Sequence, residues 1–203
     1  MALRYLLPGQ MRFMQEQGFE VIMISADGKE LKEVTEQEQC PHIIVPMTRK
    51  ITPWQDLKCL WKLVRIFRKE KPGIVHTHTP KAGLLGMLAA KIAGVKVRIH
   101  TVAGLPLMVE TGMKYRILKA VEKLTYAAAT QVWPNSNSLL QFIREHQLAK
   151  ASKLDIIANG STNGINLQRF DRSALSPAIL EETKQLIRYD AKNTYLLCIG
   201  RLV

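Results

Sequence analysis

The stretch Gly73-Ile-Val-His-Thr-His-Thr-Pro-Lys-Ala-Gly-Leu-Leu-Gly86 decides the fold class of this 203-residue chain. Ile74 and Val75 are typical of a short buried strand, and the polar residues 76–79 crowd its carboxyl end. Pro80 stands where proline is tolerated, in the first turn of a helix. Open α/β sheets bind ligands where a parallel strand ends in polar side chains and passes into a helix. We therefore expect the chemistry of the protein near this stretch.

Strand-like and helix-like runs alternate along the rest of the chain. Apolar runs predict strands at residues 19–25, 42–46, 73–78, 96–101, 130–135 and 153–158. Helical patterns fall between them, at residues 8–17, 29–39, 53–69, 80–93, 111–129 and 136–146. This alternation predicts an α/β fold with a Rossmann-like, doubly wound and mostly parallel sheet.

Both ends of the chain depart from that pattern. The chain opens on a turn into a helix, so we expect the first strand of the sheet to be missing. After a helix near residues 177–188, residues 194–199 are typical of a strand that opens a second, truncated domain. The sequence thus predicts a Rossmann-like domain at residues 1–170, followed by a linker helix and the start of another domain at residues 171–203.

Composition points to a folded, basic protein of the reducing cytosol. The net charge is +12, from 29 Lys and Arg against 17 Asp and Glu, which suits anionic partners such as phosphates or an acidic membrane face. Few aromatic residues accompany the basic ones and no RNA- or DNA-binding signature is present, so we expect no nucleic acid partner. Three widely spaced cysteines fit neither a disulfide framework nor a zinc site. No apolar run is long enough for a transmembrane helix, and no signal peptide is evident.

Histidines mark the predicted site. His76 and His78 lie two residues apart on one strand and share a face, and His100 ends another strand. Three imidazoles would suit zinc, but no carboxylate or cysteine stands at ligand spacing, so we expect no metal. His78, nearest the strand end, is the candidate for ligand contact, and we expect His76 to be a buried partner of the backbone.

Other segments allow both a ligand and a structural interpretation. Lys81, in the first turn of a helix, would either bind a phosphate or carboxylate with the free N–H groups or be a solvated surface lysine. Gly9 lets a turn approach a phosphate closely, although most single glycines merely turn the chain. Ser136 is a strong helix N-cap, and residues 159–164 predict a loop of defined shape. Residues 105–129 form an amphipathic pattern that faces a core or an anionic membrane.

Together these segments resemble the N-terminal domain of a family 4 glycosyltransferase with the GT-B fold, of the bacterial capsular or lipid-linked polysaccharide type. The segments that carry the resemblance are residues 8–25, 73–86, 134–136, 163–170 and 198–203. The resemblance implies that a sugar passes from a nucleotide diphosphate sugar, with retention and without a metal or cofactor, to a polyprenyl-diphosphate-linked glycan. The protein would then be cytoplasmic and peripheral at the inner face of the membrane.

The resemblance also implies roles for individual residues. His78, Lys81 and Thr101 fall on the acceptor side, and Gly9 and Arg201 match positions that contact the donor diphosphate. The family's usual T-x-H-G segment ends here as Ala103-Gly104, with alanine in place of the histidine, so no catalytic residue is predicted. Because most donor contacts would lie beyond residue 203, we expect the 203-residue chain alone to be inactive.

Two other functions fit parts of the sequence. A nucleotide-sugar epimerase would need a bound dinucleotide and its G-x-G-x-x-G turn, which the sequence lacks. A non-catalytic module could use the basic charge to bind an anionic surface. Substitution of His78 and Lys81 separates this module from an enzyme, because only an enzyme would lose turnover.

Overall fold

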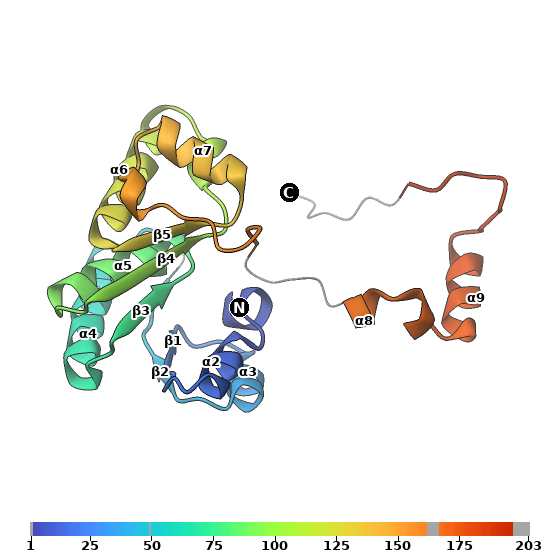
Figure 1. Ribbon diagram of the computed structural model, residues 1–203, viewed down its shortest axis with the longest axis horizontal. Coiled ribbons are helices and arrows are strands. Elements are labelled where there is room, and N and C mark those ends of the chain that lie inside the picture. Colours follow the sequence, from blue (N-terminus) through green and yellow to red (C-terminus); the bar gives the residue numbers. More distant parts are fainter. Residues whose placement is uncertain (1, 49, 162–166, 197–203) are drawn as a thin grey trace. The chain divides into compact units, whose positions relative to one another are not determined.

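The computed structural model describes residues 2–48, 50–161 and 167–196 and divides the chain into two compact units (Figure 1). The first unit comprises residues 1–163 and the second residues 164–203. The first unit holds every described strand, so it carries the α/β fold.

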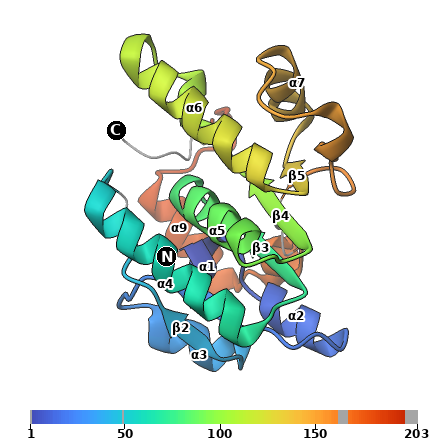
Figure 2. The same ribbon diagram turned by 90° about the vertical axis from the view of Figure 1, so that its left-hand side faces the viewer.

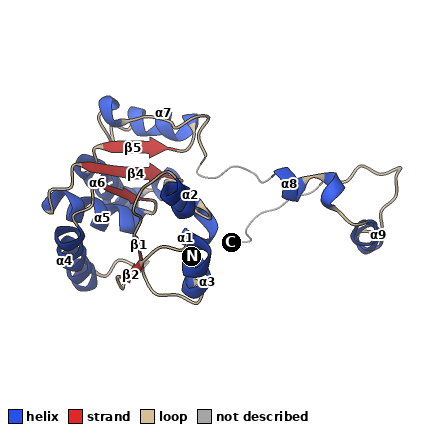
Figure 3. Ribbon diagram, turned by 60° about the horizontal axis from the view of Figure 1, so that its bottom comes forward, coloured by secondary structure: helices blue, strands red, loops and turns tan. Residues whose placement is uncertain are grey.

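All strand pairs of the first unit are parallel, as the sequence predicts. Strand β1 (Met23–Ser25) pairs with β2 (His42–Ile44) in one small sheet. A second sheet has the order β3-β4-β5, formed by Ile74–Thr77, Val97–Val102 and Gln131–Pro134 (Figure 1). Strands β4 and β5 lie side by side in Figure 3. The register places Thr77 beside His100, so polar residues of β3 and β4 meet near the carboxyl edge of this sheet.

The helices follow the predicted positions closely. Those of the first unit are α1 (Ala2–Leu6), α2 (Gln10–Glu16), α3 (Leu31–Glu38), α4 (Pro53–Glu70), α5 (Pro80–Ile92), α6 (Gly112–Ala128) and α7 (Asn137–Glu145). Helix α5 lies between α4 and α6 and contacts both of them as well as β3 and β4 (Figure 2). Residues 106–108 and 151–153 form short 3₁₀ turns.

One predicted strand of the first unit is wrong. Residues 153–158 form no strand, and only Leu154 makes an isolated parallel bridge, to Val132. The segment instead begins with a 3₁₀ turn, and the Lys153 ammonium donates to the carbonyl oxygens of Tyr126 and Ala129 at the end of α6. These contacts hold the segment by a side chain rather than by a backbone ladder.

Helix α5 approaches the sheet closely because it carries two glycines on the packed face. A Cβ atom at Gly83 would overlap the ring of His100. A Cβ atom at Gly86 would lie 2.7 Å from Thr77 Cγ2. Since these distances leave no room for a methyl group, the two glycines set the separation of α5 from β3 and β4 and confine the His100 ring.

The second unit contains short helices. They are α8 (Leu167–Phe170), a 3₁₀ turn at Arg172–Ala174 and α9 (Pro177–Leu186), whose N-cap Ser176 accepts a hydrogen bond from the Ile179 N–H. The helix predicted near residues 177–188 is thus confirmed. Residues 194–196, the described part of the strand predicted at 194–199, are not in a strand, and the rest of that prediction lies outside the described residues.

Candidate active site

A pocket of about 150 Å³ opens at the carboxyl ends of β3 and β4. It is lined by Leu6 of α1, by His78, Thr79 and Pro80 at the start of α5, by residues 100–104 and by Glu122 of α6. The position agrees with the prediction from residues 73–86, because both strands deliver their polar ends to one edge of the sheet.

Two imidazoles in the wall of this pocket are neutral at pH 7. Burial lowers the pKa of His78 to about 4, and burial together with the neighbouring His78 lowers the pKa of His100 to about 4. His100 Nδ1 lies 2.8 Å from the Thr77 hydroxyl, whereas His78 Nδ1 has no hydrogen-bond partner within the described ranges. A neutral imidazole can donate or accept one hydrogen bond at each ring nitrogen, so His78 retains a free one for a ligand.

His76 differs from its expected role as a buried backbone partner. The residue is exposed, and its Nε2 lies 2.8 Å from the hydroxyl of Thr101. Its ring centroid is 4.1 Å from that of His78 and 5.4 Å from that of Trp133. His76 therefore fixes the Thr101 hydroxyl. Within the part of the chain that the structure describes, no three His, Cys, Asp or Glu side chains gather as a metal ion would require.

Lys81 lies outside the wall of the pocket and is held by the loop before α4. Its ammonium is 2.6 Å from Asp56 Oδ1 and 3.0 Å from the Thr48 hydroxyl, and it also contacts the Thr52 hydroxyl and the Lys50 carbonyl. Burial alone would raise the pKa of Asp56, but hydrogen bonds from Lys81 and Thr52 hold it below its ordinary value. These contacts give Lys81 a structural anchoring role, and its contact with an acceptor stays a prediction.

The predicted diphosphate residues receive no test from this geometry. Gly9 has φ +76°, and its N–H donates to the Glu38 carboxylate at 2.6 Å, which also accepts from the Arg12 N–H at 3.1 Å. An internal anion thus already occupies the turn at Gly9. Arg201 lies outside the described residues. Both assignments remain predictions.

Glu122 is the site residue that the sequence analysis missed. It lies on α6, its side chain is 3% exposed, and it lines the pocket. Burial raises the pKa of this carboxyl group above its ordinary value, and the nearby Tyr126 hydroxyl offsets part of the rise. Helical spacing could have found it. Positions 118, 122, 125 and 126 fall on one face of the helix, and because that face is directed at the core, the glutamate at position 122 is directed there too.

Two loop predictions also agree with the structure. Ser136 Oγ accepts a hydrogen bond from the Leu139 N–H at 3.2 Å and caps α7. The Ser161 N–H donates to the Asn135 carbonyl oxygen, and Gly160 stands at φ +80° with its Cα against that carbonyl. Only glycine fits there, so the described residues 159–161 have a defined shape, as predicted.

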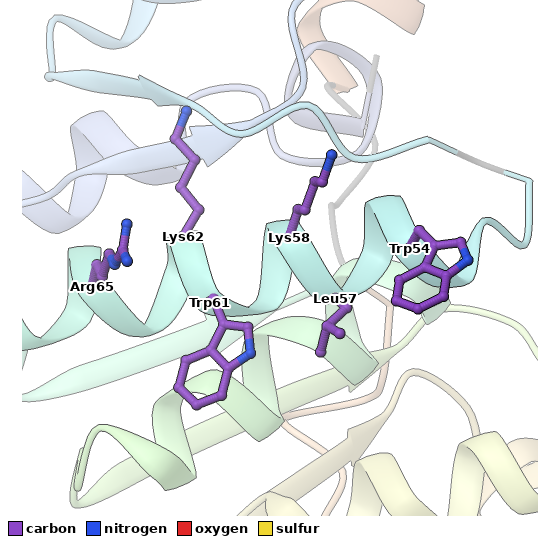
Figure 4. Close-up of a pocket in the computed structure, with 6 residues that line it drawn as sticks. All are labelled: Trp54, Leu57, Lys58, Trp61, Lys62 and Arg65. Carbon is purple, nitrogen blue, oxygen red and sulfur yellow. The ribbon is translucent and has the colours of Figure 1, made fainter.

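A second hollow, wide and open, runs along the outer face of α4 (Figure 4). Its lining combines exposed apolar and basic side chains, namely Trp54, Leu57, Lys58, Trp61, Lys62 and Arg65. Trp54 is 81% exposed and Trp61 52% exposed. Figure 4 shows Lys58 and Lys62 leaving the helix on one side and Leu57 and Trp61 on the other. In the described residues, no helix is both long and apolar enough to cross a membrane.

Comparison with known proteins supplies the family. Residues 8–160 match the glycosyl transferase 4-like domain. The chain is 39% identical over 98% of its length to the capsular polysaccharide biosynthesis glycosyltransferase CapM of Staphylococcus aureus, covering 50% of that protein. It is 26% identical over 91% of its length to an Escherichia coli UDP-Gal:α-D-GlcNAc-diphosphoundecaprenol α-1,3-galactosyltransferase, covering 46% of it. The chain therefore spans about half the length of these relatives.

Solved structures support the fold. A glycosyltransferase from Rickettsia africae matches with a TM-score of 0.63 at 22% identity, over 90% of this chain and 46% of that one. Anabaena HepE in complex with UDP and glucose matches with a TM-score of 0.59 at 15% identity, over 89% of this chain and 47% of that one. These likenesses confirm a Rossmann-like domain of the GT-B type. Because the family match covers most of the first unit, including the pocket at β3 and β4, the chain belongs to the glycosyl transferase 4-like family.

Proposed function

We propose that the protein transfers a sugar from a nucleotide diphosphate sugar to a lipid-diphosphate-linked glycan during synthesis of a capsular or other envelope polysaccharide. The observation that carries this proposal is the pocket at the carboxyl ends of β3 and β4, which presents hydrogen-bonding groups suited to sugar hydroxyls. The name of the E. coli relative supports the donor and acceptor classes, and the name of the S. aureus relative supports a role in capsular polysaccharide synthesis.

In the proposed reaction this chain supplies the acceptor side. An acceptor hydroxyl oxygen bonds to the anomeric carbon of the donor while the bond from that carbon to the diphosphate breaks, with retention of configuration, and the hydroxyl proton leaves with the diphosphate. His78 and Thr101 contact the acceptor, and Gly9 and Arg201 contact the donor diphosphate. The nucleotide sugar is itself the donor, so the proposal includes no further cofactor.

We also propose that the protein works at the inner face of the membrane, where a lipid-linked acceptor would be. Exposed indole rings beside lysines are typical of surfaces that enter the headgroup region of an anionic bilayer. The outer face of α4 has this composition, and Met113, Ile117 and Leu124 add exposed apolar side chains on α6. Binding to anionic but not neutral vesicles, weakened in a Trp54→Ala, Trp61→Ala double variant, would support this placement. Equal binding to both kinds of vesicle, or to neither, would contradict it.

The test of the transfer reaction uses the protein at its full natural length. It is incubated with UDP-galactose, UDP-glucose or UDP-N-acetylglucosamine and with GlcNAc-diphosphoundecaprenol, and the lipid product is weighed by mass spectrometry. We expect a gain of one sugar with at least one donor, and a loss of most turnover in a His78→Ala variant.

Two outcomes would contradict the proposed function. Conversion of the nucleotide sugar to an epimer, with no sugar added to the lipid, would favour an epimerase. Full turnover in a His78→Ala, Lys81→Ala double variant would show that this pocket is not the acceptor site. The 203-residue chain serves as a control, and we expect it to be inactive.

A further inference from the structure

The carboxylate of Glu122 is buried in an unusual environment. Its side chain is 3% exposed, yet no Lys, Arg or His forms an ion pair with it in the described chain. A buried carboxylate without a cationic partner destabilises a fold, so glutamate is rarely found in such a place unless it has another purpose. Glu122 lines the pocket at β3 and β4, where a bound group could reach it.

Most of the hydrogen-bonding capacity of the Glu122 carboxylate is unused, because a carboxylate can accept about four hydrogen bonds. Tyr126 stands one helical turn further on and is fully buried, and its hydroxyl is the side-chain group that acts on the carboxylate and lowers its pKa. The hydroxyl of Thr125, also on this face, donates to the Val121 carbonyl of the same helix. The Tyr126 ring lies 5.9 Å from that of His100, which continues the wall of the pocket. The carboxylate is thus available to a ligand.

The charge of the pocket selects the kind of ligand. His78 and His100 are neutral at pH 7, the Lys81 ammonium is held by Asp56 outside the pocket, and the lining includes no other basic residue. A diphosphate would meet a carboxylate here and no cation, so it is repelled. An uncharged polyol can donate a hydroxyl to the carboxylate and bond to an imidazole, and a cavity of about 150 Å³ suits a single small ring.

We propose that Glu122 binds the acceptor sugar by accepting a hydrogen bond from one of its hydroxyl groups, so that the pocket holds the uncharged sugar ring and the diphosphate stays outside. This assignment rests on the proposed function and adds a specificity-determining residue to it. It also gives the sugar ring and the diphosphate of the acceptor different locations, whereas the sequence predicts one set of acceptor contacts at His78, Lys81 and Thr101.

The test is a cycle of enzyme variants and acceptor analogues. The full-length wild type and the Glu122→Gln variant are assayed with a farnesyl-diphosphate-linked GlcNAc and with its monodeoxy forms. One missing hydroxyl should lower kcat/KM of the wild type by about 10- to 100-fold, the range for a hydrogen bond to a charged group. The same analogue should lower kcat/KM of Glu122→Gln by a clearly smaller factor, about 2- to 10-fold, because the amide oxygen of glutamine offers only an uncharged hydrogen bond. The loss in Glu122→Gln should appear mainly as a raised KM for the acceptor.

Thermal unfolding separates this role from a structural one. If Glu122 serves a ligand, removing its buried charge should raise Tm by about 2–4 °C in Glu122→Gln while acceptor recognition falls. The exposed neighbour Lys123→Gln is the matched control and should change neither property. A second variant, Glu122→Asp, keeps the charge but withdraws it from the pocket and should weaken recognition without raising Tm.

Several results would overturn the proposal. They are an unchanged acceptor KM in Glu122→Gln, equal losses for every deoxy analogue in both enzymes, or unfolding of both Glu122 variants, which would show that the carboxylate supports the fold. Absence of transfer by the wild type with any acceptor would instead contradict the proposed function. The two failures are therefore distinguishable.

Discussion

The pocket at β3 and β4 and the outer face of α4 reverse the usual distribution of side chains. In the pocket a carboxylate and two imidazoles are withdrawn from water, whereas on α4 two indole rings are left in it. Neither arrangement favours folding. A buried charge lowers the stability of the folded state, and an exposed aromatic ring does not add to it. The comparison teaches that the stability of the fold does not account for either region, in agreement with the sugar ligand proposed for the pocket and the membrane surface proposed for α4.

The largest expected effect compares one aromatic residue from each region. Tyr126→Ala should lower the free energy of unfolding by about 3–5 kcal/mol, because the side chain is fully buried beneath the pocket. Trp54→Ala should change it by less than about 0.5 kcal/mol, because that ring is exposed. Urea denaturation measures both. Similar losses in the two variants would break the contrast between the regions.

The next effect is a dependence of stability on pH that arises in the pocket. The pKa of His100 is about 4 in the folded protein against an ordinary value of 6.5, so the unfolded chain binds more protons between these values. Stability is therefore fully present above about pH 6.5 and is lost as pH falls towards 4, by on the order of 3 kcal/mol for His100. His78 acts in the same direction.

Glu122 opposes this trend. Because its pKa is raised in the folded protein, the folded state binds the proton more tightly than the unfolded chain, and stability increases as the pH falls through that raised pKa. A His100→Asn variant isolates the imidazole contribution. Urea midpoints measured between pH 7.5 and pH 4.5 should fall less steeply in the variant than in the wild type. Parallel curves for the two proteins would show that His100 titrates normally.

A smaller effect tests the close approach of α5 to the sheet. Gly83→Ala should destabilise the fold by about 2 kcal/mol, because the new methyl group would overlap the His100 ring. Helix propensity alone predicts the opposite sign, since alanine is the better helix former by about 1 kcal/mol. Gly73→Ala is the control, because nothing lies within 4 Å of its Cβ position. Equal stability of both variants would mean that His100 moves aside without loss.

The smallest effect distinguishes two roles of Lys81. Lys81→Met breaks the partly buried ion pair with Asp56 and should cost about 1 kcal/mol of unfolding free energy. Lys91→Met, at the exposed far end of α5, should cost little. A Lys81→Met protein of unchanged stability but weakened acceptor binding would favour the predicted ligand role over the anchoring role.

The sequence predicts most of the fold because, in most segments, the hydrophobic periodicity agrees with the residues that begin or cap helices. Pro53 and Pro80 begin helices, Ser136 caps one, and residues 74–77 form a strand, all as predicted. Residues 153–158 mislead, because their apolar pattern resembles a buried strand, while side-chain bonds from Lys153 hold the segment without one. Such bonds depend on the tertiary fold and leave no local pattern.

The site is predicted less completely. His78 and Thr101 line the pocket because they end parallel strands, and strand ends can be located from sequence. Lys81 lies in the first turn of α5, but its partner Asp56 comes from another helix, and that pairing cannot be inferred from one segment. Glu122 comes from α6. The amphipathic pattern of residues 105–129 is carried by apolar and basic residues, so it gives no signal that an acidic residue of this segment is buried.

The turn at Gly9 has a consequence for how tightly any phosphate group could bind there. Its amide already donates to Glu38, whose side chain is 2% exposed and is also held by the Arg12 N–H. A phosphate oxygen that binds the Gly9 amide would have to replace the Glu38 carboxylate. If the carboxylate stayed in place, the two negative charges would repel each other across a few ångströms. Release of Glu38 would thus be thermodynamically linked to occupation of the turn, so the apparent affinity would be the intrinsic affinity multiplied by the fraction of molecules in which the carboxylate has left.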